Sequence, residues 1–223
     1  MLSTLEVAGM SPAGNGKPKR DTYRHGDLRN ALTEAALELA RQGGPEAVVL
    51  RAATRQAGVV PNAAYRHFAD RDALLHAVSQ AAMAQVARTM EAEQAAVPPT
   101  EDPVAAARSR FRAVGTGYLR YAREEPGLFR TAFHVPGDMT HAADDTAAGA
   151  TGKTPFELLG EALDGLVDAG LLAADRRPGA EFLAWSAVHG LAVLLIDGPL
   201  RGLPPTQAHD AGQHVIDMIE RGI

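Results

Sequence analysis

The chain has 223 residues, a formal net charge of -5 and no cysteine. The lack of cysteine excludes disulfides, thiolate metal sites and cysteine nucleophiles, and a composition of 46% apolar and 22% charged residues is that of an ordinary folded protein. The apolar run at residues 191–196 is far shorter than the roughly 20 residues of a membrane helix. The N-terminal stretch lacks the basic-then-apolar order of a signal peptide, so we expect a soluble cytoplasmic protein with a disordered arm at residues 1–19.

Charge is distributed unevenly along the chain. Residues 1–71 hold 10 Lys and Arg against 7 Asp and Glu, whereas residues 72–223 hold 12 against 20. A basic head on an acidic body is typical of a nucleic-acid-binding domain joined to a regulatory one, because phosphate contacts need cations only where the duplex lies. Solvated surface charge could produce the same asymmetry.

Helical periodicity begins at residues 27–42, where apolar residues recur at intervals of four, three and four from Leu28 to Leu39. Two short helices are then predicted at residues 50–57 and 61–67, the second beginning at Pro61, whose fixed φ suits the first helical position. The turn between them, residues 58–60, has the length and the glycine of a helix-turn-helix.

The rest of the chain is also predicted to be helical. Asp70 is a good N-cap for a long helix that ends near residue 97. Further helices are predicted at residues 103–125, 128–134, 155–169, 178–197 and 206–221, while residues 136–152 have the composition of a loop. Strand signals are scarce. We therefore predict an all-α fold of about nine helices, with a three-helix head at residues 20–70 and an effector-binding and dimerisation bundle at residues 71–223.

The second helix of a helix-turn-helix places its first residues at base edges in the major groove. Asn62 can pair bidentately with adenine, and Pro61 and Ala63 can pack on thymine methyl groups. Arg66 or His67 can reach phosphate or guanine.

These segments resemble a known family. The stretches YRHGDLRNALTEAALELARQGG and LRAATRQAGVVPNAAYRHFADRDALLHAV are similar to the N-terminal DNA-binding domain of TetR-family transcriptional regulators, and WSAVHGLAVLLIDG and YLRYAREEPGLFRTAF resemble the C-terminal domain of a Trp-His-Gly subfamily of that family. The resemblance implies an all-α homodimer that binds a palindromic operator and releases it when a small molecule enters the C-terminal domain.

The resemblance also assigns residues to the DNA interface. It implies that Asn62, Ala63 and Tyr65 face the groove, that Tyr65 and His67 contact phosphate or base, and that Arg71 meets the DNA backbone. Two positions depart from the family pattern, because Val49 and Val60 replace polar residues that open the two short helices. The further candidates for DNA contact are Arg24, His25, Arg51 and Arg55.

An effector pocket is expected among aromatic and polar residues of the body. Trp185 and His189 lie four residues apart and share a helix face, as pocket lining or as a core pair in which a backbone or carboxylate partner satisfies the histidine. Gly115 lies inside a helix, at a cost of about 1 kcal/mol relative to alanine, which indicates a packing or cavity role. The candidate pocket residues are Phe111, Gly115, Tyr118, Phe129, Phe133, Trp185 and His189.

Neither catalysis nor metal binding is indicated. His189 and Asp197 are separated by about 12 Å along a helix, too far to pair, and the sequence contains neither a phosphate-binding glycine loop nor a nucleophile elbow. His209 and His214 do not share a helix face, so we expect no metal site and no cofactor.

The helix at residues 178–197 is apolar on two stripes and must be buried on both sides. We expect a second copy of the chain to cover one side together with the last helix, although a central helix in a monomeric bundle would show the same pattern. The predicted interface residues are Leu183, Leu191, Leu194, Leu195, Val215, Met218 and Ile219. The sequence thus predicts a ligand-responsive repressor that is not an enzyme, with a dimeric ligand-binding protein that has lost specific DNA binding as the alternative.

Overall fold

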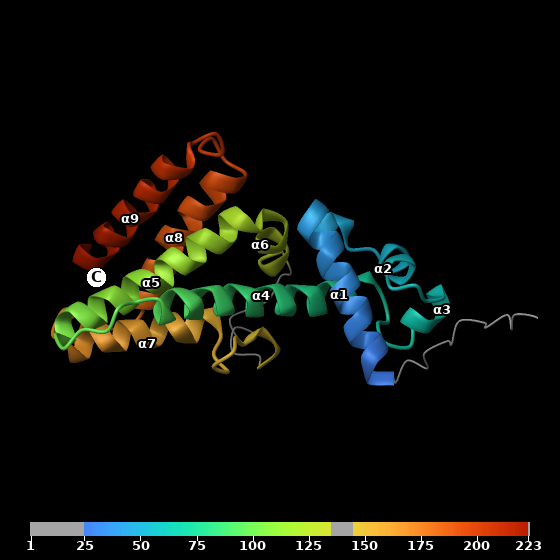
Figure 1. The fold of residues 1–223 in the computed structure, drawn as a ribbon, viewed down its shortest axis with the longest axis horizontal. Helices are drawn as coiled ribbons and strands as arrows, with labels where there is room; N and C mark the ends of the chain where they lie inside the picture. Colours follow the sequence, from blue (N-terminus) through green and yellow to red (C-terminus); the bar gives the residue numbers. More distant parts are fainter. Residues whose placement is uncertain (1–24, 135–144, 223) are drawn as a thin grey trace, which may run out of the picture.

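The computed structural model describes residues 25–134 and 145–222, and within these ranges every regular element is helical (Figure 1). Three helices form the head, α1 (His25–Gly43), α2 (Leu50–Gln56) and α3 (Pro61–Ala64), with a short 3-10 helix η1 (Pro45–Ala47) between α1 and α2. The predicted arm at residues 1–19 and Arg24 lie outside the described residues. The all-α prediction with nine α-helices is confirmed for the part of the chain that the structure describes.

The head is held by a small apolar core. Leu32 and Ala36 of α1, Ala53 of α2 and Ala64 of α3 are fully buried. Phe68, just after α3, is also buried, and its backbone N–H donates to the Ala64 carbonyl. Helix α3 ends at Ala64, three residues before the predicted boundary, and residues 65–67 form a turn with i to i+3 hydrogen bonds.

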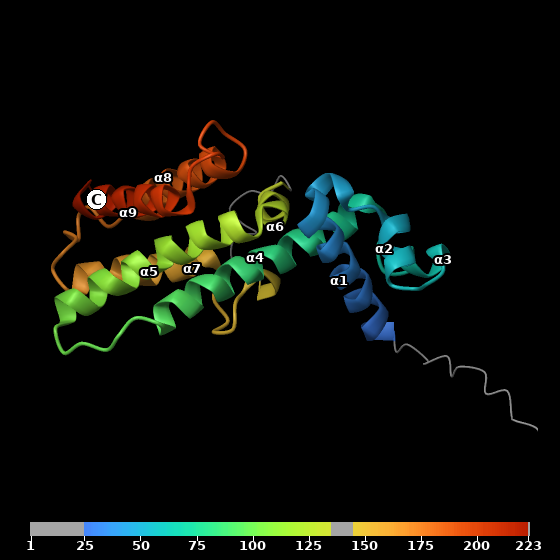
Figure 2. The ribbon, with the colours of Figure 1, turned by 45° about the horizontal axis from the view of Figure 1, so that its top comes forward.

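A long helix, α4 (Arg71–Ala95), runs from the head into the body (Figure 2). It begins as predicted at Asp70, whose carboxylate accepts a hydrogen bond of 2.8 Å from the N–H of Ala73. Against it packs α5 (Pro103–Glu124). A Cβ at Gly117 would lie 2.7 Å from the Cα of Met90, so glycine lets the two helix backbones approach closely.

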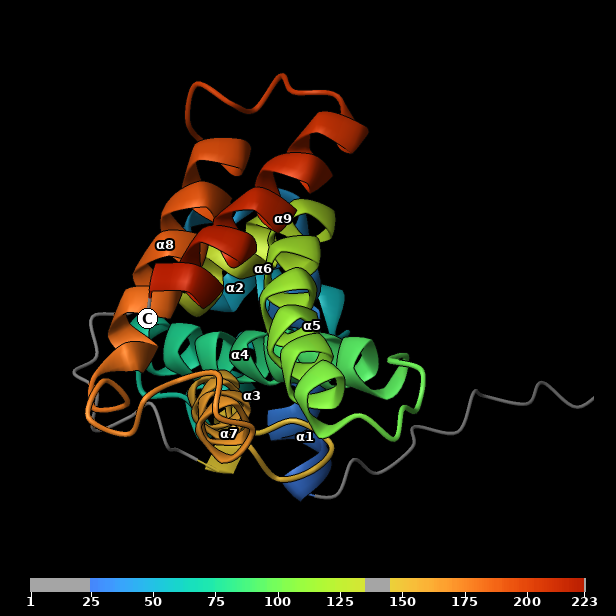
Figure 3. The same cartoon turned by 90° about the vertical axis from the view of Figure 1, so that its left-hand side faces the viewer.

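The body is completed by α6 (Pro126–Ala132), α7 (Pro155–Asp168), α8 (Ala180–Ile196) and α9 (Pro205–Gly222). Figure 3 shows α8 and α9 on one side of α5 and α7 on the other. Thr154 and Glu157 form a reciprocal capping box that starts α7. None of the described helices combines the length and apolar character that a membrane crossing requires.

Residues 145–152 of the predicted loop at 136–152 lie within the described part of the chain. Residues 145–147 form a short 3-10 helix, η3 (Asp145–Ala147). The turn that follows is fixed to α4, because the Glu91 carboxylate accepts hydrogen bonds of 2.8 and 2.9 Å from the N–H groups of Ala150 and Thr151. Residues 135–144 lie outside the described ranges.

Candidate DNA interface and effector site

The pair α2–α3 presents a polar and basic outer face at the end of the head farthest from the body (Figure 2). Tyr65 is 53% exposed, and the half-buried Ala63 and His67 border the exposed positions. Gly58, in the turn, adopts a φ of 68°, which a residue with a Cβ rarely adopts. The exposed predicted contacts on this pair are Arg51, Arg55, Pro61, Asn62, Tyr65 and Arg66.

Arg71 has a role inside the head. Its Nε donates to the carbonyl of Val48 at 2.9 Å and its Nη2 donates to the carbonyl of Pro45 at 2.6 Å. These bonds fix η1 against the start of α4, so two of the guanidinium nitrogens are already committed within the chain. The predicted contact of Arg71 with DNA stays a prediction. His25 is the first residue of α1.

Arg29, on α1, is a positioning residue that the sequence analysis missed. Its Nη1 donates to the His67 carbonyl at 2.8 Å, and its guanidinium lies 4.5 Å from the centre of the Phe68 ring. Both contacts hold the end of α3 against α1. Because they join residues that are 38 positions apart, no local pattern could have indicated them.

Two valines occupy the positions at which polar residues were expected. Val49 precedes α2 and Val60 precedes α3, and neither side chain caps its helix. Both are exposed, Val49 at 43% and Val60 at 69%. The first N–H groups of α2 and α3 therefore lack the side-chain hydrogen-bond acceptor that a serine or threonine N-cap would supply.

In the body, five of the seven predicted pocket residues come together between α5, α6 and α8. The His189 ring stacks on Phe129 at a centroid distance of 5.6 Å and meets the edge of Phe133 at 4.8 Å. Tyr118 and Trp185 complete this group, which we call the aromatic cluster.

A chain of hydrogen bonds crosses the aromatic cluster. The indole N–H of Trp185 donates to the Tyr118 hydroxyl at 3.2 Å, and the same hydroxyl lies 2.7 Å from Nδ1 of His189. Burial raises the pKa of Tyr118 well above its ordinary value and lowers the pKa of His189. The Tyr118 hydroxyl therefore accepts from the indole N–H and is also the hydrogen-bond partner of Nδ1 of His189.

The other two predicted pocket residues lie elsewhere. A Cβ at Gly115 would lie 2.9 Å from Cδ1 of Ile216, so this glycine makes room for α9 instead of lining the aromatic cluster. Phe111 is buried in the core of the body, and none of the ring contacts among the described residues joins it to the aromatic cluster. Helical spacing alone does not separate the two sides of α5.

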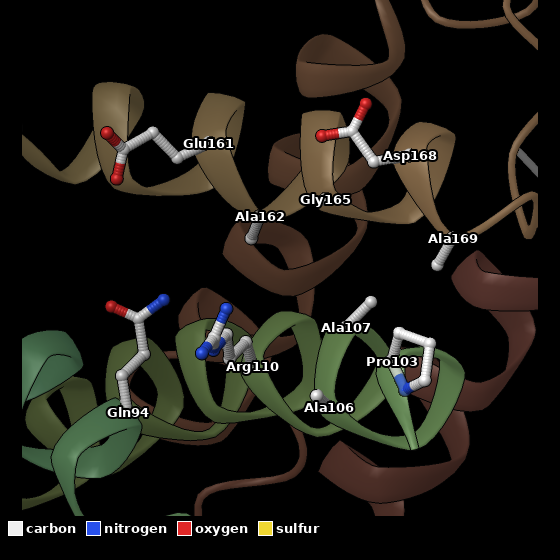
Figure 4. Close-up of a pocket in the computed structure, with 10 residues that line it drawn as sticks. All are labelled: Gln94, Pro103, Ala106, Ala107, Arg110, Glu161, Ala162, Gly165, Asp168 and Ala169. Carbon is white, nitrogen blue, oxygen red and sulfur yellow. The ribbon is translucent and has the colours of Figure 1, made fainter. Parts of the chain in front are cut away.

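A separate pocket of about 380 Å³ lies between α5 and α7 (Figure 4). Arg110 and Gln94 extend toward it from one wall, and small residues such as Ala162 and Gly165 form the other. The sequence analysis did not identify this pocket, because alanines at helical spacing are also ordinary packing residues. Its lining is Gln94, Pro103, Ala106, Ala107, Arg110, Glu161, Ala162, Gly165, Asp168 and Ala169.

Helix α6 connects the aromatic cluster to the head. Glu125, which precedes α6, accepts hydrogen bonds of 2.9 and 3.2 Å from Nε of Arg41 on α1. A Cβ at Gly127 would lie only 2.4 Å from the Ala40 carbonyl oxygen, so α6 touches the end of α1 directly. At its other end, Arg130 pairs with Asp197 just after α8, and this pairing lowers the pKa of the Asp197 carboxyl.

The outer face of α8 and α9 carries exposed large apolar side chains. Leu183 is 64% exposed, Met218 is 61% exposed and Leu194 is 42% exposed. Phe182 and Val193 are exposed beside them. We call these five residues the α8–α9 apolar face.

Four of the predicted interface residues lie partly or wholly within the chain's own core. Leu191, Leu195 and Ile219 are buried in the chain's own core, and Val215 is half-buried. Because α8 is apolar nearly all round, both expected stripes mix inward and outward residues.

Comparisons with known proteins agree with this architecture. The pattern for bacterial regulatory proteins of the tetR family matches residues 32–78, and the pattern for the tetracyclin repressor-like C-terminal domain matches residues 111–219. A search of curated proteins gave no match.

Solved structures share the fold over nearly the whole chain. A protein of unknown function from Rhodococcus sp. RHA1 is 26% identical and covers 92% of this chain and 99% of its own, with a TM-score of 0.69. The TetR family regulator PfmR from Thermus thermophilus is 22% identical, covering 86% and 98%, with a TM-score of 0.53. FadR from Bacillus subtilis, solved with stearoyl-CoA, is 13% identical, covering 87% and 98%, with a TM-score of 0.63.

A helix-turn-helix head on a helical body defines a transcriptional regulator with a DNA-binding and a ligand-binding domain. The two matched patterns belong to one family and together cover more than half of the chain. The chain belongs to the TetR family. Its assignment to the Trp-His-Gly subfamily stays a prediction.

Proposed function

We propose that the protein is a cytoplasmic, ligand-responsive repressor that binds a palindromic operator as a homodimer, with a DNA-binding head at residues 20–70 and an effector and dimerisation domain at residues 71–223. The exposed polar and basic face of α2–α3 carries this proposal. In a helix-turn-helix this face meets the major groove, and here Asn62, Tyr65 and Arg66 are exposed on it while Ala64 and Phe68 are buried beneath. The proposed DNA contacts are the residues predicted from the sequence.

The α8–α9 apolar face supports the dimer. Five large apolar side chains exposed on two adjacent helices are more than scattered surface residues, and apolar surface of this kind marks association sites. A two-fold axis through this face would make it self-complementary. It would also join two heads, whose recognition helices must lie about 34–36 Å apart to enter successive major grooves.

We propose the aromatic cluster as the effector site, with Tyr118, Phe129, Phe133, Trp185 and His189 as the contacts. It combines an apolar surface with a few hydrogen-bonding groups, which is the composition of small-molecule sites. The FadR structure, which has the same fold, contains stearoyl-CoA. This supports a body that holds a small molecule, although the chemistry of the ligand can differ.

The signal would reach the head through α4 and α6. An effector can shift an equilibrium between two states only by binding one of them more tightly. Phe129 places α6 in the aromatic cluster, and Glu125 and Gly127 place the start of α6 against α1. A ligand that displaces α6 therefore changes the contacts between α6 and α1. The position of the head then changes, and with it the spacing of the two recognition helices in the dimer.

The test is selection of binding sites by the full-length protein from a random-sequence DNA library, followed by gel shift with the selected duplex. We expect Asn62→Ala and Tyr65→Ala to weaken binding to that duplex about tenfold or more, since one base contact contributes about 1–3 kcal/mol of discrimination. Arg201→Ala is the control, because Arg201 is an exposed residue of the body.

The outcomes separate the two candidate functions. If Asn62→Ala and Tyr65→Ala bind as the parent does, α3 is not the recognition helix. If the parent selects no sequence at all, a dimeric ligand-binding protein without specific DNA binding becomes the better account. Val49 and Val60, which leave α2 and α3 without a side-chain cap, allow this alternative, whereas the basic head disfavours it.

A further inference from the structure

Val60 is the most exposed of the large apolar side chains in the described part of the chain, at 69%. It lies between α2 and α3 with an extended backbone, directly before Pro61 and Asn62. The side chain neither caps α3 nor packs into the core of the head. Its apolar surface therefore faces solvent on the same outer part of the head as the exposed residues of α3.

The chemistry of a duplex limits what an isopropyl group can contact there. In the major groove, three of the four bases present only hydrogen-bonding groups at their edges, and thymine alone adds an apolar one, its C5-methyl. A valine gains nothing from donors, acceptors or phosphate oxygens. Its contact with a methyl group is favourable, because the contact removes the apolar surface of both groups from water.

We propose that Val60 packs on the C5-methyl group of a thymine beside the base that Asn62 reads, and that this contact makes the thymine a specificity-determining position of each half-site. The inference rests on the proposed DNA-binding function. In this proposal, Val60 forgoes the hydrogen bond with which a serine or threonine would cap α3 and makes an apolar contact with a base instead.

Val49 offers a matched comparison. It is also an exposed valine that precedes a short helix without capping it. The docking geometry differs, because the first helix of a helix-turn-helix crosses the DNA backbone while the second enters the groove. Val49 is thus expected to lie over sugar and phosphate, where no methyl group is available.

The experiment uses the full-length protein and the duplex selected as described above. Each thymine of the half-site is replaced in turn by deoxyuridine, which removes only the methyl group and keeps the base pair. We expect one replacement to weaken binding about fourfold per half-site, as the loss of one buried methyl group implies. At that position Val60→Ala should lose the fourfold ratio, while any thymine that Pro61 or Ala63 contacts keeps its own. Val49→Ala should keep the ratio at every position.

Three results would overturn the inference: a parent that binds every uracil duplex as tightly as the thymine duplex, a Val60→Ala variant that keeps the full ratio, or a Val49→Ala variant that loses it. Each of these leaves specific DNA binding itself intact. Failure of the parent to select any sequence would instead contradict the proposed function. Circular dichroism should show that Val60→Ala is folded, because the side chain is exposed.

Discussion

At the scale of single residues, the hydrogen-bond chain in the aromatic cluster determines the state of His189. The expected partner of this histidine was a backbone or carboxylate group, whereas the structure supplies the Tyr118 hydroxyl at 2.7 Å. A hydroxyl can donate to the neutral ring without adding a negative charge. The cluster can thus hold an uncharged histidine among aromatic rings, and protonation of His189 would place a positive charge in this largely apolar group.

This arrangement predicts a pH dependence of stability. Burial lowers the pKa of His189 in the folded state, so the unfolded chain binds the proton more readily. The free energy of unfolding is therefore highest above the ordinary histidine pKa of about 6.5 and falls as the pH is lowered through that value. Urea unfolding at several pH values should show a shallower fall between about pH 6.5 and 5.5 for His189→Gln than for the parent.

The control for this prediction is His209→Gln, because His209 is exposed on α9. This variant should keep the pH dependence of the parent. If His189→Gln and His209→Gln give the same slope, His189 is not the group that destabilises the fold on acidification.

At the same scale, Tyr118→Phe should destabilise the body. The change removes the acceptor of the Trp185 N–H and the hydroxyl partner of Nδ1 of His189. An unsatisfied buried polar group costs about 1–3 kcal/mol, so the midpoint of urea unfolding should fall clearly. An unchanged midpoint would show that both groups find other partners without cost.

At the scale of elements, α6 depends on glycine. A Cβ at Gly127 would lie 2.4 Å from one backbone oxygen of α1 and 2.5 Å from the next, so Gly127→Ala must move α6 away from the head. We expect a loss of about 1–3 kcal/mol in the free energy of unfolding, the usual cost of overpacking, together with weaker binding to the selected operator.

Gly165→Ala in α7 is the matched control for Gly127→Ala. A Cβ there meets no atom within 4 Å, so the variant should be stabilised by about 0.5–1 kcal/mol through the helix preference of alanine. Urea unfolding measures both changes. If Gly127→Ala has the same urea midpoint as the parent, α6 moves away from α1 without any loss in the free energy of unfolding.

At the scale of the whole molecule, the α8–α9 apolar face should control assembly. Leu194→Glu places a charge within the proposed interface, where an unpaired buried carboxylate is strongly unfavourable. Light scattering should therefore show a dimer for the parent and a monomer for this variant. Val49→Glu is the control, because Val49 is 43% exposed, much like Leu194 at 42%, but lies in the head. A dimeric Leu194→Glu variant would exclude this face as the interface.

Much of the fold could be predicted from the sequence because its signals are local. Asp70 caps α4, Pro61 opens α3 and Gly58 forms the turn, and each of these features acts within a few residues of its own position. The boundary of α3 was less accurate, because the chain continues beyond Ala64 as a turn with i to i+3 hydrogen bonds, which has the same local sequence signals as a helix.

The candidate sites were only partly predictable. The residue types at the aromatic cluster were identified from helical spacing, but Gly115 could not be separated from them, because its partner Ile216 lies far along the chain in α9. The same limit applies to Arg29 and His67, which meet only when α1 and α3 pack together.

The sequence by itself determined that the chain is helical, where along the chain its helices lie, and that its head resembles a helix-turn-helix, because caps, turns and periodicity are properties of neighbouring residues. Only the tertiary structure decided which sides of α8 face outward. That helix is apolar nearly all round, so its neighbours in space, and not its own pattern, bury Leu191 and Leu195 and leave Leu183 and Leu194 exposed.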